Sequence, residues 1–408
     1  MNLLFLLPQP PYPPRQGTAI RNWGLIKHLV ARHVITLVSF ADEGQADAPE
    51  LRAACRRIVF VPAPRRSRTD RLRTLLSPKP DLARRLWSAE MAHALAEVLN
   101  ESAFDFVHVE GLEMAPYIPI ILSSKSPRPK IVYDAHNAEA VIQHRAFVTD
   151  FRRSQPARWP AALYSWLQIP RLQAFEAEVC RQVEAVTCVS HEDATALQKL
   201  VPRLRPIVVP NGIDLESYTE YEIQNIAKPP HGTSPHTQLV FTGKMDYRPN
   251  LDAALWFADH IFPRIRAACP EAQFIIVGQK PPDSLLKRHG QNNVVVTGAV
   301  EDTRPFIAGS AVYVAPLRMG GGTRFKLLEA MALARPIVST SLGAEGFRVQ
   351  SGRELWLADT PADFAEAVLT LLADPERAKA MGEVGLAFVR AEYDWSVIIP
   401  RLEELYEN

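Results

Sequence analysis

Cysteine is scarce in this sequence, and long apolar runs are missing. The four cysteines form no CxxC pair and have no histidine at metal-ligand spacing: Cys55, Cys180, Cys188 and Cys269. We expect buried thiols in a reducing compartment, not a disulfide framework or a zinc site. No apolar run approaches the roughly 18 residues that span a bilayer. The opening MNLLFLLPQPPYPP has no basic residue before its short apolar run, which predicts a β-strand and no secretion signal. These absences predict a cytoplasmic protein, at most peripheral on the inner face of the membrane.

The length and composition of the chain predict two folded domains with different partners. Of the 408 residues, 47% are hydrophobic and 22% are charged, which suits two soluble domains of about 200 residues each. Residues 1–215 hold 27 Lys and Arg against 21 Asp and Glu, whereas residues 216–408 hold 19 against 24. The basic half is expected to meet an anionic partner.

Apolar β-rich runs alternate with helical patterns in both halves, which is typical of βαβ units and parallel sheets. Strands are expected at 3–7, 34–40, 58–61, 104–109, 130–134, 185–189 and 206–209, and again at 239–242, 273–277, 294–297, 311–315, 336–339 and 355–357. Helices are expected at 18–31, 80–99, 250–268, 325–333, 361–372, 375–390 and 397–405.

This order predicts an α/β protein with two Rossmann-like, parallel-sheet domains that share a ligand cleft, because such sheets bind ligands beyond the carboxyl ends of their strands. We expect an N-terminal domain at 1–215, a linker at 216–237 and a C-terminal domain at 238–390. A last helix, within 391–408, is expected to return to the N-terminal domain.

The stretch GGGTRFKLLEAMALARPIVST begins at Gly320 and places two cations, Arg324 and Lys326, in the first turn of a helix. Cations there oppose the helix macrodipole at a cost of about 0.3–1 kcal/mol each. A bound anion would reverse that cost, because glycines let backbone N–H groups approach it and the helix start adds more. The pattern therefore predicts phosphate binding by Arg324, Lys326 and the preceding residues Gly320, Gly321, Gly322 and Thr323, with Thr323 as N-cap. The alternative is a loop whose cations point into solvent.

Glu329 and Gly17 are weaker candidates. Glu329 follows Lys326 by three residues, so it could form an intrahelical ion pair or accept hydrogen bonds from paired ligand hydroxyls, as ribose offers. Gly17 is the single glycine in a loop with five prolines before the first helix. Since a nicotinamide-cofactor domain needs GxGxxG at that place, a dehydrogenase is disfavoured. Gly17 could let the backbone approach a substrate or could simply serve helix entry.

Polar residues gather after two expected strands of the N-terminal half, in FVHVEG and IVYDAHNAEA. They are His108, Glu110, Asp134, His136, Asn137 and Glu139. Any one of them alone would suggest a structural role, but together at strand ends they make His136 a candidate functional residue.

Two segments could meet an anionic membrane surface. Residues 56–85 contain ten Lys and Arg against two Asp, and residues 152–175 mix arginine with tryptophan and tyrosine, which favour the lipid interface. A solvated basic face is the alternative. Nucleic acid is disfavoured because the basic run has no aromatic platform.

These motifs together resemble the retaining glycosyltransferases of family four, often called group one, which have the two-domain GT-B fold. The resemblance rests on VVPNGIDLESY, FTGKMDYRPNLDAALWF, FIIVG, VVVTGAVED and VYVAPLRMGGGTRFKLLEAMALARPIVSTSLGAEGF. PPYPPRQGTAIRNWGLIKHLV looks like the opening of the bacterial sugar transferases of exopolysaccharide assembly. The family implies sugar transfer from a nucleotide-sugar donor, held by the C-terminal domain, to an acceptor held by the N-terminal domain.

The resemblance also implies roles for individual residues. Glu329 would bind the donor ribose and His136 would lie beside the transferred sugar. The other implied donor-binding residues are Gly17, Asn211, Gly212, Gly243, Lys244 and Arg248. Two departures matter: the family's first glutamate falls on Gly321, and its usual phosphate-binding lysine falls on Pro249. Arg324 and Lys326 are therefore the expected catalytic cations.

In that family, retention is thought to proceed by same-face attack, with no protein nucleophile, and we expect no metal or other cofactor. A hydrolase or epimerase of the same fold, acting on nucleotide sugar without an acceptor, is one alternative. Another is a catalytically silent nucleotide-sugar-binding partner, because of the missing glutamate at Gly321.

Overall fold

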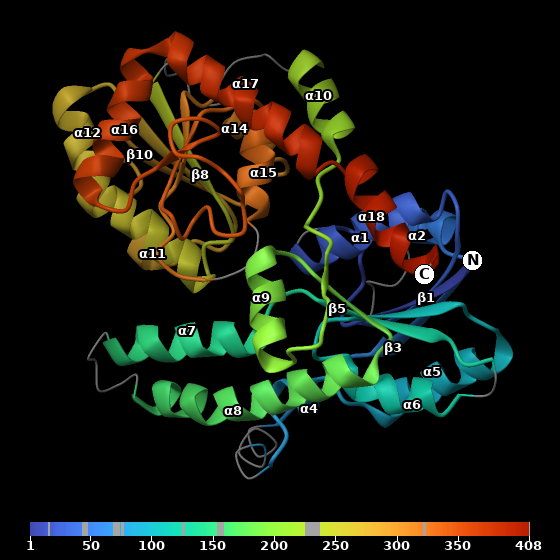
Figure 1. Ribbon diagram of the computed structural model, residues 1–408. Coiled ribbons are helices and arrows are strands. Elements are labelled where there is room, and N and C mark those ends of the chain that lie inside the picture. The colour runs from blue at the N-terminus through green and yellow to red at the C-terminus, as the bar shows by residue number, and fades with distance from the viewer. Residues whose placement is uncertain are drawn as a thin grey trace. The chain divides into compact units, whose positions relative to one another are not determined.

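The computed structural model describes residues 1–14, 17–42, 48–67, 74, 77–124, 127–152, 159–224, 237–320 and 324–407. The chain divides into two compact units, each built on its own sheet (Figure 1). The first unit contains Met1–Gly212 together with Ile398–Asn408, and the second contains Ile213–Val397.

The first unit has a seven-stranded parallel sheet with the order β3-β2-β1-β4-β5-β6-β7. All five residues of Leu3–Leu7 are fully buried, because helices cover both faces of such a sheet, and this explains the continuous apolar runs in the sequence. The strands are β1 (Asn2–Leu7), β2 (Val34–Ala41), β3 (Arg57–Pro62), β4 (Phe106–Glu110), β5 (Lys130–Ala135), β6 (Ala185–Cys188) and β7 (Ile207–Val208).

The helices of the first unit follow its strands. The long helices α7 and α8 lie side by side as a hairpin (Figure 1). The described helices are α1 (Gly17–Leu29), α2 (Pro49–Ala54), α4 (Leu82–Arg85), α5 (Ala89–Glu101), α6 (Ile118–Leu122), α7 (Glu139–Arg152), α8 (Trp159–Gln182) and α9 (His191–Leu200), with a 3₁₀ turn η1 at Ala115–Tyr117.

The second unit repeats this plan with a six-stranded parallel sheet of order β10-β9-β8-β11-β12-β13. Its strands are β8 (Gln238–Thr242), β9 (Gln273–Val277), β10 (Val294–Gly298), β11 (Val312–Ala315), β12 (Ile337–Ser339) and β13 (Trp356–Leu357). Its helices are α10 (Leu215–Gln224), α11 (Arg248–Trp256), α12 (Phe262–Ala268), α13 (Asp283–Leu286), α14 (Arg304–Ala308), α15 (Phe325–Ala332), α16 (Pro361–Ala373) and α17 (Pro375–Glu392).

The two parallel sheets expected from the sequence are confirmed, and every expected strand is present with small shifts at its ends. The single helix expected at 80–99 is wrong. The chain instead forms α4 and α5, because Ser88 caps the second helix by accepting a hydrogen bond from Met91 N at 3.4 Å. The helix expected at 250–268 is also divided. A π-helical turn at Phe257–Ile261 precedes α12, where Pro263 offers no N–H to continue the ladder.

The C-terminal helix α18 (Trp395–Glu407) joins the first unit from Ile398 onward. Its apolar side chains Ile398, Ile399 and Leu402 are buried, and Tyr406 contacts β4. In the part of the chain that the structure describes, no helix is both long and apolar enough to cross a bilayer.

Candidate active site

The strand order reverses at one point in each sheet, between β1 and β4 in the first and between β8 and β11 in the second. Ligands of open α/β sheets bind beyond the carboxyl ends of the strands at this reversal. The candidate residues lie at the ends of parallel strands or in the segments and helices that follow them, so each unit presents its own set of groups.

Lys326 is the best-placed cation of the second unit. It is the second residue of α15, and its Nζ donates to the carbonyl oxygen of Thr242 at 2.8 Å and to Oδ1 of Asn250 at 2.7 Å. The ammonium also lies 4.3 Å from the ring centroid of Phe241. Burial and the charge of Arg324 together lower the pKa of Lys326 to about 7, and the charge of Glu329 partly opposes them. The charged form of Lys326 is therefore disfavoured at this position.

The segment after β8 leaves no room for side chains around this ammonium. A Cβ on Gly243, at φ +154°, would lie 2.6 Å from Nδ2 of Asn250 and 3.0 Å from Nζ of Lys326. Asn250 Nδ2 also donates to the carbonyl oxygen of Lys244 at 3.0 Å. Only glycine leaves this approach open, so Gly243, Asn250 and Lys326 form one small cluster at the end of β8.

Arg324 lies at the start of α15, as the sequence predicted, but it precedes the first turn of the helix and does not belong to it. It is itself the N-cap residue, so the prediction of Thr323 as N-cap is wrong. Gly320 has φ +104°, and a Cβ there would lie 3.1 Å from Nη2 of Arg324, so the guanidinium lies against the backbone of Gly320. The candidates Gly321, Gly322 and Thr323 lie outside the described residues.

Glu329 accepts a hydrogen bond at Oε1 from the hydroxyl of Tyr218, at 3.1 Å. Burial raises the pKa of Glu329, although Tyr218 and Lys326 both lower it. The Lys326 ammonium points to the end of β8, so Lys326 and Glu329 have different hydrogen-bond partners. The carboxylate is thus held by α10 and not mainly by an intrahelical ion pair.

The two other candidate cations are more exposed. Lys244 Nζ lies 3.6 Å from Oδ1 of Asp246, and Arg248 is an exposed residue at the start of α11. Neither side chain is a hydrogen-bond partner of the Lys326 ammonium, which donates to Thr242 and Asn250.

In the first unit, a buried ion pair joins α1 to the end of β5. Arg21 donates from Nε and Nη2 to the two carboxylate oxygens of Asp134, at 2.7 and 2.9 Å. Thr187 donates to the same carboxylate at 2.6 Å. The Arg21 guanidinium and these hydrogen bonds outweigh burial and hold the pKa of Asp134 well below its usual range. Arg21 also donates to Oδ1 of Asn211 at 3.2 Å, which anchors the PNG turn.

His136 lies beside this pair. Its Nε2 donates to Oε2 of Glu110 at 3.0 Å and lies 3.6 Å from Oδ2 of Asp134. Burial disfavours the imidazolium, but the hydrogen bond to Glu110 and the charge of Asp134 outweigh this and raise the pKa of His136. The structure therefore brings together three of the polar residues that the sequence singled out: Glu110, Asp134 and His136.

The remaining polar candidates have other positions. His108 is buried in β4. Glu139 is the first residue of α7, and Asn137 lies two residues before it. Gly17 is the first residue of α1, one turn before Arg21, and Gly212 ends the first unit's main segment. Their roles in donor binding stay predictions.

Glu110, Asp134 and His136 each offer a ligand atom, and these atoms lie within 4.8 Å of one another. Such a set could hold a metal ion. However, Arg21 and Thr187 already donate to both oxygens of Asp134. The guanidinium thus already supplies a positive charge to this cluster.

Sequence reasoning missed the residues that hold the site together: Arg21, Tyr218, Asn250 and Tyr406. Arg21 carried a signal, because it lies in an otherwise weakly charged helix close to the first strand. Tyr218 and Tyr406 lie far along the chain from their partners, and nothing local marks them.

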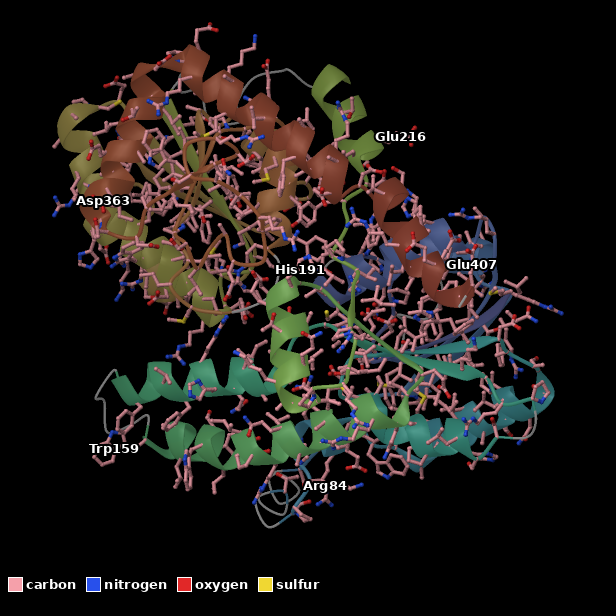
Figure 2. All side chains as sticks on the ribbon, viewed as in Figure 1. Arg84, Trp159, His191, Glu216, Asp363 and Glu407 are labelled. Carbon is pink, nitrogen blue, oxygen red and sulfur yellow. The ribbon has the colours of Figure 1, made fainter. Side chains whose placement is uncertain are left out.

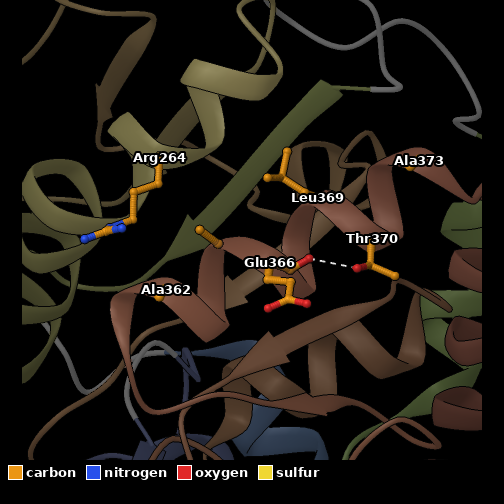
Figure 3. A pocket seen from close by; sticks show the side chains of 7 residues that line it. Arg264, Ala362, Glu366, Leu369, Thr370 and Ala373 are labelled. Atoms are coloured by element: carbon orange, nitrogen blue, oxygen red, sulfur yellow. Dashed lines mark hydrogen bonds between the residues drawn. The ribbon is translucent and has the colours of Figure 1, made fainter.

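A groove between α12 and α16 is distinct from these groups. Figure 3 shows residues that line it, among them Arg264 on α12 and Ala362, Glu366 and Leu369 on α16. It contains none of the predicted site residues, and it is largely apolar, so it is not the candidate site.

Comparison with known proteins identifies the class of the chain. The family "Glycosyltransferase Family 4" matches residues 16–217, and "Glycosyl transferases group 1" matches residues 236–374. The chain belongs to these glycosyltransferases, as the sequence motifs indicated.

Two curated bacterial relatives are similar over different lengths. One is a GDP-mannose-dependent monoacylated alpha-(1-6)-phosphatidylinositol monomannoside mannosyltransferase of Corynebacterium glutamicum. It is 23% identical over 342 residues, which cover 78% of this chain and 80% of that protein. The other is an uncharacterized 44.6 kDa protein in the cps region of Klebsiella pneumoniae, 23% identical over 164 residues, which cover 38% of this chain and 42% of that protein.

Solved structures show the same fold. Sucrose-phosphate synthase from Thermosynechococcus elongatus superposes with a TM-score of 0.74 at 16% identity, covering 100% of this chain and 98% of that one. Anabaena Alr3699/HepE in complex with UDP superposes with a TM-score of 0.66 at 15% identity, covering 100% of both chains. The fold is therefore the GT-B fold, with its two Rossmann-like units.

Proposed function

We propose that this glycosyltransferase is retaining, and that it moves a sugar from a nucleotide-sugar donor to a glycan or lipid-linked acceptor in cell-surface polysaccharide assembly. The similarity to a mannosyltransferase that uses GDP-mannose and a glycolipid supports the donor and acceptor classes. The relative in a cps region supports polysaccharide assembly. The structural neighbour that binds UDP supports a nucleotide diphosphate as leaving group.

The observation that carries this proposal is the Lys326 ammonium at the strand reversal of the second sheet, with Arg324 beside it at the start of α15. Burial and the neighbouring Arg324 charge both disfavour the charged ammonium. A diphosphate placed there would compensate both effects, and the N–H groups of the helix start would add to the attraction. Placing two partly buried cations side by side is hard to explain without such an anion.

We assign the rest of the donor to the second unit and the acceptor to the first. Glu329 would accept hydrogen bonds from the two ribose hydroxyls, as Tyr218 holds its carboxylate in place. In the first unit, His136 would contact the transferred sugar, with Glu110 and Asp134 supporting its protonated form.

The proposed reaction breaks the bond between the anomeric carbon and the diphosphate oxygen, which keeps the electron pair. Lys326 and Arg324 would stabilise the charge that develops on this oxygen. The acceptor hydroxyl would attack from the same face and give its proton to the departing phosphate, so no protein nucleophile is needed. The chemistry requires no metal if the two cations neutralise the diphosphate.

The test combines nucleotide binding and turnover. A ligand at about 100 times its Kd stabilises a protein by about 2.7 kcal/mol, so a thermal-shift screen with UDP, GDP, ADP and their sugars should single out one base. With that donor, Arg324→Ala should lower kcat by roughly 100–1,000-fold. Near-normal turnover would contradict the role of Arg324.

Arg318→Ala is the matched control, because Arg318 lies in the same connection between β11 and α15. Its guanidinium pairs with Asp252 at 3.0 Å and stacks on Trp256 at 4.7 Å, so it is already engaged away from Lys326. This variant should keep turnover within about threefold.

The same assay separates the alternatives. Release of free nucleotide at the full rate without any acceptor would indicate a hydrolase, and conversion of the donor into an isomer would indicate an epimerase. Tight donor binding with no turnover on any acceptor would indicate a silent binding partner. An anomerically retained product linked to the acceptor supports the proposal.

We also propose that the first unit contacts an anionic membrane surface through α8. Trp159, Leu163 and Trp166 recur on one side of this helix and are 62%, 58% and 55% exposed. Figure 2 shows Trp159 where α8 begins, at the end of the α7–α8 hairpin. Exposed tryptophans of this kind favour the lipid interface.

The basic segment 56–85 now supports this contact less than its composition suggested. Several of its arginines pair with carboxylates: Arg57 with Glu101 at 2.6 Å, Arg66 with Asp81 at 2.6 Å and Arg85 with Glu113 at 3.0 Å. Residues 68–73, 75, 76 and 153–158 lie outside the described part of the chain.

Sedimentation with vesicles of anionic phospholipid tests the membrane contact. The intact chain should pellet with the vesicles, and the variant carrying Trp159→Ser and Trp166→Ser should stay in the supernatant while keeping the nucleotide thermal shift. Equal sedimentation of the two proteins would exclude α8 as the contact.

A further inference from the structure

We propose that Tyr406, on the C-terminal helix, is a positioning residue for His136 and acts through a buried chain formed by His108 and Glu110. This inference concerns how the first unit orients its site histidine, and it rests on the proposed function only in giving that histidine a role in transfer. The residues involved are 298 positions apart in the chain at their widest contact.

The first link joins α18 to β4. The hydroxyl of Tyr406 and Nε2 of His108 are 2.7 Å apart, and both side chains are buried. His108 is fixed on its other face by Phe5, whose ring is stacked on it with centroids 4.5 Å apart and an interplanar angle of 8°. The imidazole therefore has one orientation, with Nε2 toward Tyr406.

The second link is the carboxylate of Glu110, which lies between two histidines. Its Oε1 is 3.7 Å from Nδ1 of His108, and its Oε2 accepts from Nε2 of His136 at 3.0 Å. Among the described residues, Oε1 has no hydrogen-bond partner, so the nearby His108 ring edge is the polar group that faces it. Glu110 itself is completely buried.

Proton positions along this chain follow from the tyrosine. Burial raises the pKa of Tyr406 well above its usual value of 10, and the charges of Glu110, Glu403 and Asp134 raise it further. The hydroxyl therefore keeps its proton, and we assign it as the donor to His108 Nε2, which places the His108 proton on Nδ1, toward Glu110. Glu110 stays an acceptor for His136 Nε2, and Nδ1 of His136 faces the side of Gly111, where a Cβ would lie 3.6 Å from it.

Other charged groups also surround these histidines. Asp134 and Arg21 face His136, with opposite effects on its pKa. On the Tyr406 side, His33 Nε2 is 2.8 Å from Oε1 of Glu403, and the His33 ring packs edge-on against Tyr406 at 5.5 Å. These groups remain in every variant below, so a change would come from the hydroxyl alone.

The test is Tyr406→Phe, which removes one oxygen and keeps the ring. Without the hydroxyl donor, His108 can move its proton to Nε2 and turn a lone pair toward Glu110. With a lone pair and no N–H toward it, the carboxylate is less stabilised on that side and attracts the proton of His136 more strongly, so the pKa of His136 should rise by about half a unit.

Two readouts check this. In a protein with ¹⁵N-labelled histidine, the ring nitrogen shifts report the His108 tautomer and the His136 titration directly, without any substrate. In the transfer assay, kcat should fall roughly three- to tenfold, well short of the loss of an acid–base group. Because the protonated form of His136 is the functional one, the alkaline limb of the pH profile should move to higher pH while the donor KM stays within twofold.

Tyr117→Phe is the control, because Tyr117 is a buried tyrosine of the same unit whose hydroxyl donates to the carbonyl oxygen of Leu86 at 2.7 Å. It should leave the His108 tautomer and the pKa of His136 unchanged. An unchanged tautomer and His136 titration in Tyr406→Phe would overturn the proposal, even if kcat fell. If the ring nitrogens respond as expected but the wild-type chain transfers no sugar, the positioning chain stands and the proposed function fails.

Discussion

Pro249 and Lys326 show how a single charge can be moved between elements. The sequence resemblance to family-four glycosyltransferases implies a phosphate-binding lysine at the position of Pro249, in the segment after β8. Here the ammonium comes from α15, and Lys326 Nζ donates to Thr242 and Asn250 in and after that same strand. The cation thus reaches the end of β8 from a helix far along the chain, because Lys326 lies 76 residues after Asn250.

The pKa of Lys326, about 7 in the free protein, makes donor binding pH-dependent. A bound diphosphate favours the charged ammonium and raises this pKa, so binding takes up a proton. Affinity should be highest below pH 7 and should weaken by up to about tenfold per unit as the pH rises above 7. Calorimetry with UDP-glucose or GDP-mannose between pH 6 and 9 measures this, because both phosphates of a nucleotide sugar are diesterified and do not titrate there.

Two substitutions separate charge from proton uptake. Lys326→Arg keeps a permanent charge, so it should bind donor with a flat pH profile. Lys326→Met removes the charge and should weaken binding by about 10–100-fold at neutral pH. A wild-type affinity that is constant from pH 6 to 9 would contradict a Lys326–diphosphate contact.

At the scale of elements, the start of α7 contrasts with the start of α15. The N–H of Glu139 donates to Oε1 of Glu176, which reaches it from α8, at 3.0 Å. A carboxylate at a helix N-terminus is normally favourable. However, burial and the charges of Glu139 and Asp193 together raise the pKa of Glu176 to about 8, although backbone hydrogen bonds lower it. The acidic side chain is therefore protonated at neutral pH in the folded chain.

Glu176→Gln should therefore stabilise the protein at alkaline pH. The folded pKa is above the unfolded value of about 4.5, so the wild-type stability contribution is complete at low pH and is lost as the pH rises through 8. The shift sets an upper bound of roughly 5 kcal/mol on this loss. Thermal unfolding should show similar Tm values at pH 5 and a Tm roughly 5 °C higher for the variant at pH 8.5.

Glu178→Gln is the matched control, because Glu178 is an exposed carboxylate of the same helix. Its Tm should follow the wild type at both pH values. Equal Tm values for Glu176→Gln and wild type across the whole range would mean that Glu176 ionises normally.

Elements were more predictable than contacts between them. Continuous apolar runs such as Leu3–Leu7 specify buried parallel strands locally, so the strands and their alternation with helices follow from the sequence. The cations at 324 and 326 were visible because they violate a local rule about helix starts. By contrast, the pairs Arg21–Asp134 and Tyr218–Glu329 join residues 113 and 111 positions apart. A sequence pattern carries no signal for such pairs, because only the fold brings them together.

At the scale of the whole molecule, two sheets of related order place different chemistry at their reversals. The first has carboxylates and histidine around Arg21, and the second has cations and glycine. This division agrees with a sugar-handling role for the first unit and a phosphate-binding role for the second. The net charges of the two halves would suggest the opposite division, because the basic N-terminal half contains the carboxylate cluster. Local arrangement and not net charge therefore decides which unit suits a phosphate.

Metal removal tests this division for the whole enzyme. Dialysis against EDTA should leave kcat within about twofold, and added Mg²⁺ or Mn²⁺ should not raise it further. The reason is that Lys326 and Arg324 would neutralise the diphosphate, while Arg21 holds both oxygens of Asp134 and so occupies the best candidate ligand set. A loss of more than tenfold that Mn²⁺ restores would contradict this. Asp134→Asn would then locate the ion: if it abolished the Mn²⁺ effect, the metal would lie in the first unit, and if the effect persisted, the ion would accompany the diphosphate in the second.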